Sequence, residues 1–294
     1  MTATLATPDS PASPPPQLSP GGRTAIRTLL IVAAAVLLIA VVALSATAAW
    51  GVSSFRVVKD SMPLPATLTA VEIDTGSVPV AIRLTSDRES GEPRVDMRMV
   101  NSVRAGADPL SVDADGTTAR VTIDAEPSEF LRWGRAGEIT LVLPPELARR
   151  LTVTTRQDVG VVFAQTDLDQ FIAHTVDGTV VLNGAARRID ITTEDGDVTT
   201  RDPISVSQSF RARTTSGDVS VEFAETPDTI DAETQRGDVV VTLPPPGPYF
   251  VDASTGTDNG ATVVRVPQTR DREAAASLVT ARTDSGDVVI SDGR

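Results

Sequence analysis

Apolar and polar residues alternate along most of the chain after Leu68, which is the pattern of half-buried β-strands. The alternation is most regular around the phrase Thr-x-x-Gly-Asp-Val, which starts at Thr193, Thr214, Thr234 and Thr283, with a looser copy at Thr175. The glycines at 178, 196, 217 and 237 are 18, 21 and 20 residues apart. Such a period is typical of stacked repeats, in which one unit is too short to bury its apolar face alone.

Each repeat predicts a strand, a tight Gly-Asp turn and a second strand. The residues seven and five positions before each glycine, and those two and four positions after it, are mostly apolar. The residue three positions before each glycine is threonine. If the repeats stack in register, the threonines form one ladder and the Gly-Asp turns form another along the same edge. Because the threonines share the parity of the apolar positions, we expect them to be buried, with hydroxyls bonded to one another or to backbone carbonyls.

The pattern therefore predicts an all-β, solenoid-like stack of strand-turn-strand repeats over residues 67–294, clearest over 151–294. Earlier strands are expected at 68–73, 78–84, 95–100, 119–123 and 138–143. The sequence leaves open whether 67–143 belong to the same solenoid or form a separate β-domain that caps it. The 49 residues between Gly237 and Gly286 are predicted to contain one divergent unit and a loop at 267–273.

The N-terminal part of the chain has a different character. Residues 1–27 are predicted to be a disordered, Pro-rich cytoplasmic tail, 28–50 a transmembrane helix and 51–66 a stalk. Arg23 and Arg27 precede the apolar run, which favours a cytoplasmic N-terminus and a single-pass anchor in the cell membrane, with the C-terminal domain extracytoplasmic. The alternative is a cleaved signal peptide, because Ala46-Thr47-Ala48 has the small-x-small form of a cleavage site. Both alternatives export the rest of the chain.

Composition narrows the range of partners. The formal net charge of −13 argues against nucleic acid, since phosphate binding requires clustered Lys and Arg. With no cysteine, the chain has neither disulfides nor thiolate metal ligands. We expect the membrane, through the N-terminal helix, and an envelope protein or a glycan as partners, and no cofactor.

The Thr-x-x-Gly-Asp-Val repeats, the Leu-Pro-Pro strand endings at Leu143 and Leu243 and the single N-terminal membrane segment resemble the bacterial putative adhesin family. The resemblance covers Leu68 to the end and is strongest from Leu141 onward. It implies a β-solenoid-like fold at or near the cell envelope, with some members linked to envelope-stress sensing. It brings no catalytic residues.

Two groups of residues are candidates for a binding surface. Trp133, between Arg132 and Arg135, is either a stacking platform for a sugar or protein side chain or a plug for the end of the stack. The second group is the row of turn aspartates, Asp197, Asp218, Asp238 and Asp287. Calcium would need six to eight oxygens, and one carboxylate per coil supplies too few, so we interpret these aspartates as turn residues and predict no metal site. The only histidine, His174, has opposite parity to its apolar neighbours and is predicted to be exposed.

These features predict a membrane-anchored, extracytoplasmic, non-catalytic module for binding, adhesion or envelope scaffolding. Two alternatives are a glycan-active enzyme on a parallel β-helix and a component of envelope-stress signalling. The enzyme would require a cleft with convergent polar groups and carboxylates of perturbed pKa.

Overall fold

The computed structural model describes residues 29, 32–34, 36–38, 40–41, 55–89, 91–102, 109–125, 137–256 and 260–293. The chain divides into two compact units, Met1–Ser54 and Phe55–Arg294. In the first unit, the described residues between 29 and 41 are helical. Within the described residues, no helix has both the length and the apolar character needed to cross a membrane. The predicted tail and the other residues of the predicted span lie outside the described residues.

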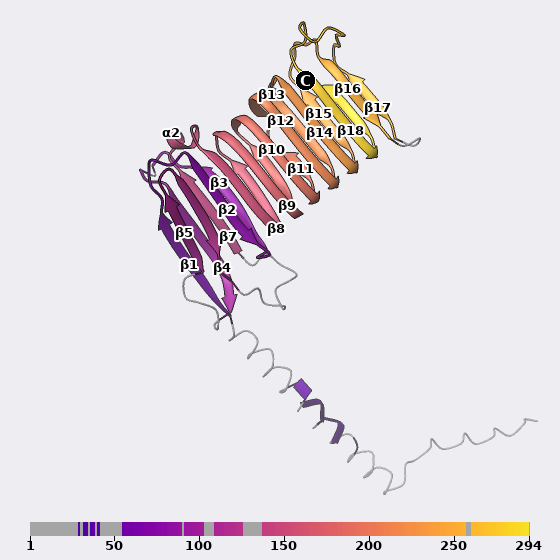
Figure 1. Ribbon diagram of the computed structural model, residues 1–294. Coiled ribbons are helices and arrows are strands. Elements are labelled where there is room, and N and C mark those ends of the chain that lie inside the picture. The colour runs from indigo at the N-terminus through magenta and orange to yellow at the C-terminus, as the bar shows by residue number, and fades with distance from the viewer. Residues whose placement is uncertain are drawn as a thin grey trace, which may run out of the picture. The chain divides into compact units, whose positions relative to one another are not determined.

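The second unit is a flattened stack of β-coils (Figure 1). Each coil consists of a first strand, a corner at a glycine and a second strand that runs back, so the described strands form one 19-stranded sheet folded into two layers. We call these the first-strand layer and the second-strand layer. In spatial order the coils are β6/β7 (Thr118–Ile123, Gly137–Leu143), β2/β3 (Ala70–Gly76, Val80–Ser86), β8 (Thr152–Gln165), β9 (Leu168–Asn183), β10/β11 (Ala185–Asp195, Val198–Thr200), β12/β13 (Ile204–Ser216, Val219–Glu225), β14/β15 (Thr229–Arg236, Val239–Leu243), β18/β19 (Leu278–Ser285, Val288–Asp292) and β16/β17 (Phe250–Thr255, Thr262–Arg265).

Neighbouring coils pair in parallel and in the register that the repeat predicts. Thr193 faces Thr175 on one side and Thr214 on the other, and Val198 faces Val180 and Val219. This confirms the strand-turn-strand unit and the two ladders along one edge.

At both ends of the stack the spatial order departs from the chain order. β18/β19, the last coil in the sequence, lies between β14/β15 and β16/β17. Near the other end, β2/β3 lies between β6/β7 and β8. The predicted divergent unit in the 49-residue gap is therefore real, but it forms the end coil of the stack.

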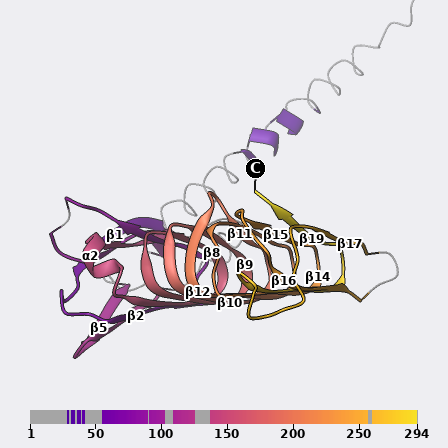
Figure 2. The ribbon, with the colours of Figure 1, turned by 90° about the horizontal axis from the view of Figure 1, so that it is seen from above.

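The described strands between residues 67 and 143 belong to the same solenoid, because β2 and β3 pair directly with β8. Antiparallel strands close this end of the stack: β5 (Leu110–Asp115) pairs with β6, and β4 (Arg94–Ser102) pairs with β7. The short helix α2 (Pro145–Ala148) follows the Leu143-Pro144-Pro145 ending. Figure 2 shows this end and the end formed by β17 at opposite sides of the stack.

One structural expectation was wrong. Within the predicted stalk, residues 55–63 form β1 (Phe55–Pro63), which pairs antiparallel with β4 over nine residue pairs. Val58 and Met62 alternate with polar residues and face Met99 and Val95 of β4. Pro63 and Pro65 favoured a stalk, but a nonlocal partner strand, β4, supplies the backbone hydrogen bonds of this segment.

The core is a single column of small and β-branched side chains between the two layers. Ala173, Ala212, Ala232 and Ala281 are fully buried at the equivalent position of β9, β12, β14 and β18, and Ile191 is buried at this position of β10. Phe210 packs edge to face on Phe223, with ring centroids 5.2 Å apart. The low aromatic content of the sequence fits this thin core, since the space between the layers accepts small residues at most positions.

Candidate functional site

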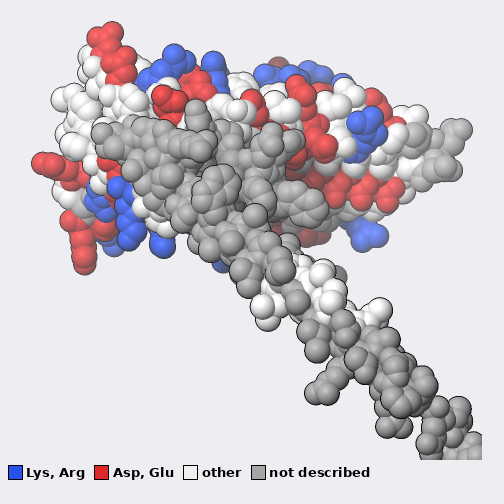
Figure 3. Space-filling view, turned by 90° about the horizontal axis from the view of Figure 1, so that it is seen from below, with Lys and Arg blue, Asp and Glu red and all other residues white. Residues whose placement is uncertain are grey.

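The turn aspartates lie along one edge of the stack and are exposed. Each uses one carboxylate oxygen to accept a hydrogen bond from the backbone of the next coil: Asp197 Oδ1 from the Asp218 N–H at 2.9 Å and Asp218 Oδ1 from the Asp238 N–H at 2.8 Å. Asp238 and Asp287 accept in the same way from the N–H groups of Asp287 and Ala261, both at 2.8 Å. The structure therefore brings all four predicted aspartates together and gives them a role in joining coils. Figure 3, seen from this side, shows acidic side chains over the C-terminal coils.

The threonine ladder lies inside the same edge. The hydroxyls of Thr214, Thr234 and Thr283 donate to the carbonyls of the glycines one coil away, Gly196, Gly217 and Gly237, at 3.1, 2.9 and 2.9 Å. This confirms that the repeat threonines are buried, and that these three are bonded to backbone carbonyls. Further along the stack, the buried hydroxyls of Thr75, Thr155, Thr175 and Thr193 and the amide of Gln157 have no hydrogen-bond partner among the described residues.

In the part of the chain that the structure describes, no three His, Asp or Glu side chains lie close enough together to form a metal-binding cluster. His174 is exposed on the outer side of β9. The remaining predicted surface residues, Arg132, Trp133 and Arg135, lie outside the described residues.

The outer face of the first-strand layer carries a network of charges that the sequence analysis did not identify. On β12, Arg211 contacts Asp231 at 3.1 Å, and Arg213 contacts Asp231 at 2.9 Å and Glu233 at 3.0 Å. Burial lowers the pKa of Arg213, but its ion pairs with Glu233 and Asp231 outweigh this effect and raise the pKa. The signal was present in the repeat, because these residues occupy the positions six and four before each glycine.

A second pair joins β9 to β10 on the same layer. Arg187 Nε and Nη2 donate to the two carboxylate oxygens of Asp169 at 2.8 and 2.9 Å, and Arg187 Nη1 donates to Gln208 at 2.7 Å. The hydrogen bonds from Arg187 lower the pKa of the Asp169 carboxyl, and the same contact raises the pKa of Arg187.

At the C-terminal coils the charged face opens into a shallow groove of about 410 Å³. Arg282 donates to Asp252 at 2.5 Å, and the guanidinium of Arg272 lies 4.8 Å from the ring centroid of Phe250. Arg211, Asp231 and Glu233 line the other side of the groove. An aromatic ring, three guanidinium groups and three carboxylates thus surround one depression, a chemistry that suits polar ligands such as sugars or charged peptide segments. We call it the C-terminal groove.

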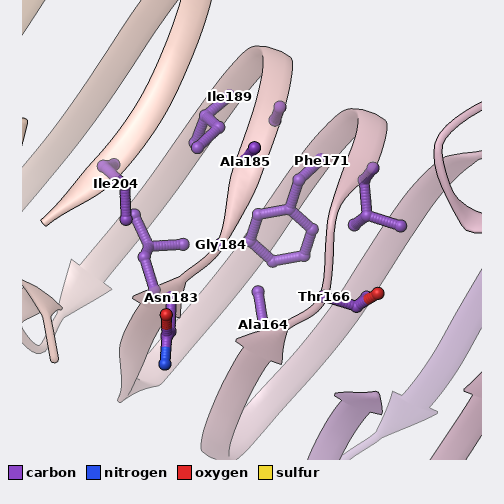
Figure 4. A pocket seen from close by; sticks show the side chains of 11 residues that line it. Ala164, Thr166, Phe171, Asn183, Gly184, Ala185, Ile189 and Ile204 are labelled. Carbon is purple, nitrogen blue, oxygen red and sulfur yellow. The ribbon is translucent and has the colours of Figure 1, made fainter. Parts of the chain in front are cut away.

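Two other hollows contribute less. On the outer face of the second-strand layer, Lys59, Ser61, Asp96 and Arg98 line a polar depression of about 520 Å³. Inside the stack, Phe171, Ala164 and Ile204 surround a void of about 10 Å³, with Thr166 at its margin (Figure 4). A void of this size has room for about one water molecule and for no larger ligand.

Comparison with known proteins agrees with the repeat architecture. Residues 163–291 match the family model described as Toastrack DUF4097. A search of curated proteins finds no significant match.

Among solved structures, similarity extends to bacterial proteins with low sequence identity. A putative adhesin from Bacteroides fragilis shares 14% identity over 81% of this chain and 97% of its own length, with a TM-score of 0.40. A putative cell adhesion protein from Clostridium sporogenes shares 10% identity over 81% and 100%, with a TM-score of 0.34. A putative lipid binding protein from Parabacteroides distasonis shares 11% identity over 81% and 97%, with a TM-score of 0.31.

Proposed function

From the Toastrack DUF4097 domain that the chain carries over residues 163–291, we propose that this protein is a non-catalytic binding module anchored by residues 28–50 in a bacterial cell membrane. The solenoid then lies on the extracytoplasmic side and binds an envelope glycan or an envelope protein. The observation that supports binding is the C-terminal groove, in which Phe250, Arg272 and Arg282 present a ring and two cations on a rigid, hydrogen-bonded surface.

The geometry favours binding over catalysis. The acids of the C-terminal groove are held in ion pairs: Asp252 with Arg282, and Asp231 with Arg211 and Arg213. A carboxylate that is bound to a guanidinium is occupied by that partner, whereas a general acid or base must lie within hydrogen-bond reach of the group with which it exchanges a proton. The groove is also shallow and lies on the outside of the sheet, so a bound polymer would stay in contact with water.

Binding is tested with the full chain expressed in bacterial cells and incubated with peptidoglycan sacculi and with isolated surface polysaccharide. The double variant Arg272→Ala/Arg282→Ala is expected to lose most of the bound glycan. Arg156→Ala is the matched control, because Arg156 is an exposed arginine on the same layer. It occupies the repeat position of Arg282, five coils away, and its contact with Glu72 is long, at 3.5 Å. Equal binding by wild type and double variant would overturn the glycan proposal, and glycan cleavage would overturn the non-catalytic one.

The membrane anchor is tested by a separate measurement. The proposal rests on the sequence of residues 28–50, which is long and apolar enough to span a membrane. The full chain should remain in the membrane pellet after alkaline carbonate, and protease added outside spheroplasts should digest residues 55–294. Deletion of residues 28–50 should abolish pelleting. Release of a chain that begins just after Ala48 would instead establish the signal-peptide alternative.

A further inference from the structure

The end of the stack formed by β16 and β17 has an open strand edge. The N–H of Phe250 donates to Ser277 and the N–H of Gly256 donates to Thr283, so the even-numbered residues of β16 face β18. Because strand residues alternate, the N–H and C=O groups of Val251, Ala253 and Thr255 point to the other side. Within the described residues, the only pairing on that side is the bridge of Tyr249 with Gln268, before the strand begins.

The apolar core is incompletely covered at the same end. Val279 and Ala281, one coil inward, are 1% and 0% exposed, whereas Val251 and Ala253 at the equivalent positions of β16 remain partly exposed. In the second layer, Val264 of β17 is also partly exposed, while its neighbour Ile290 is 0% exposed. Both layers thus end with apolar side chains that lack a neighbour coil.

The opposite end of the stack is built differently. There β5, β4 and β1 run antiparallel to the coils or to each other and cover the last parallel strands. Open strand edges are sites of pairing with other chains unless they are blocked by charge, proline or a covering element. The inward-facing positions of β16 carry Val251, Ala253 and Thr255, with no charge or proline.

We propose that this end binds a second copy of the same chain, with β16 pairing antiparallel to β16 of the partner about a two-fold axis at Ala253. In this register Ala253 faces Ala253 of the partner subunit and Val251 faces Thr255 of the partner subunit. All three residues that point to the open edge then form hydrogen-bonded pairs, which no other symmetric register achieves. β17 of each copy meets at the same time, since it belongs to the same coil.

Charge complementarity supports this register. It places Asp252 opposite Ser254 of the partner subunit rather than opposite a second aspartate, because β16 reverses direction. Arg282 lies next to Ser254 on β18, so its guanidinium can reach across this small side chain toward the partner's Asp252 while contacting its own. Two arginines and two aspartates then alternate across the junction, whereas apposed like charges would destabilise it.

A second copy fits this end better than a single extended peptide. One peptide strand would complete only one layer and would leave either Val251 or Val264 exposed. The same end of another chain brings both layers at once and continues the core across the junction. The dimer shares Arg282 and Asp252 with the C-terminal groove, but its main contact is the backbone edge of β16. Dimer formation and glycan binding are measured separately, so either proposal can fail without the other.

Disulfide trapping tests the register, because the chain has no cysteine of its own. Full-length Asp252→Cys and Ser254→Cys chains with different tags are co-expressed, purified in detergent and oxidised. In the proposed register, residue 252 lies about 4.5 Å (Cα to Cα) from residue 254 of the partner chain, within disulfide range. Two copies of the same variant place their cysteines about 7–8 Å apart, beyond easy bridging.

The expected result is a covalent dimer that contains both tags and that is lost when either variant is expressed alone. Light scattering in detergent should give a dimer for the wild type and a monomer for Ala253→Pro, which lacks the N–H that faces the partner but keeps the far-UV circular dichroism of the sheet. A monomeric wild type, or a mixture with no covalent dimer, would overturn the proposal.

Discussion

At the scale of single residues, each Gly-Asp corner combines a constraint of space with a hydrogen bond. A Cβ on Gly237 would lie 2.2 Å from the carbonyl oxygen of Gly217, and its φ of +140° is one that residues with side chains rarely adopt. The next residue, Asp238, uses its carboxylate to satisfy a backbone N–H of the neighbouring coil. Glycine therefore recurs at this corner of the coils because each corner is in direct contact with the corners before and after it.

The glycine constraint predicts that Gly237→Ala lowers the free energy of unfolding by about 2–4 kcal/mol, since it adds backbone strain and a clash with fixed backbone atoms. Gly91→Ala is the matched control, because a Cβ there meets nothing within 4 Å and its φ is not positive. Urea titration of the full chain, followed by circular dichroism, measures both. A similar small effect for the two variants would show that the corner relaxes.

The aspartate ladder makes a prediction that separates hydrogen bonding from charge. Asp218→Ala removes the acceptor for the Asp238 N–H and should destabilise the protein by about 1 kcal/mol. Asp218→Asn keeps a carbonyl oxygen and reduces repulsion along the row of carboxylates, so its stability should match or exceed that of the wild type. Thermal unfolding of the three proteins decides the point, and equal losses for Ala and Asn would show that the negative charge itself is needed.

At the scale of elements, the joint between β9, β10 and β12 shows how a coil of irregular length is accommodated. The register of β10 with β12 shifts between Ala186 and Arg188, so Arg187 stands outside the regular pairing. Its guanidinium links Asp169 of β9 to Gln208 of β12. The spacing of 21 residues between Gly196 and Gly217 is accommodated near this register shift, and the threonine and valine ladders stay in register.

This joint predicts a pH dependence. The pKa of Asp169 is lowered in the folded state by Arg187, so the ion pair stabilises the fold above the ordinary aspartate pKa and this contribution is lost as the pH falls through the lowered value. Both side chains are partly exposed and solvent screens their attraction, so Arg187→Ala should lower the free energy of unfolding only slightly at pH 7.

The free energy of unfolding of wild type and Arg187→Ala, measured at pH 7 and again near pH 2 to 3, should therefore converge at low pH. The variant Arg156→Ala is a suitable comparison, since the contact of Arg156 with Glu72 is longer, at 3.5 Å. A difference between wild type and Arg187→Ala that persists at low pH would mean that Arg187 acts through packing rather than through its charge.

At the scale of the whole molecule, the order of coils differs from the order of repeats. Because β18/β19 lies between β14/β15 and β16/β17, removal of the last residues of the chain removes an internal coil. In stacked repeats each coil is stabilised by its neighbours, so a gap is more harmful than a shortened end.

Truncation after Ser277 should therefore leave β16 and β17 without partners and expose their amides, together with those of β14, to hydrogen exchange. Deletion of residues 189–209 is the matched comparison, since it removes one repeat whose neighbours share its register and can pair with each other. Exchange measured by mass spectrometry should show loss of protection only in the truncated chain. Equal protection of β16 in both would contradict the inserted position of the last coil.

The repeat unit, the two ladders and their common edge follow from the amino-acid sequence alone, because alternation and glycine position are local properties that recur in every coil. It indicated Asp197, Asp218, Asp238 and Asp287 as one row, but only the tertiary structure showed that each carboxylate binds the next coil. The charged columns at Arg211 and Arg213 were visible at repeat positions, yet their pairing with Asp231 depends on which coils are neighbours.

Only the tertiary structure decided the order of the coils and the role of residues 55–63. Both depend on contacts between segments far apart in the chain, such as β1 with β4 and β18 with β14. The sequence of a single strand does not identify the strand with which it pairs. A strand exposes the same backbone groups to any partner of suitable direction and register. Which partner it meets is settled by the packing of the whole stack.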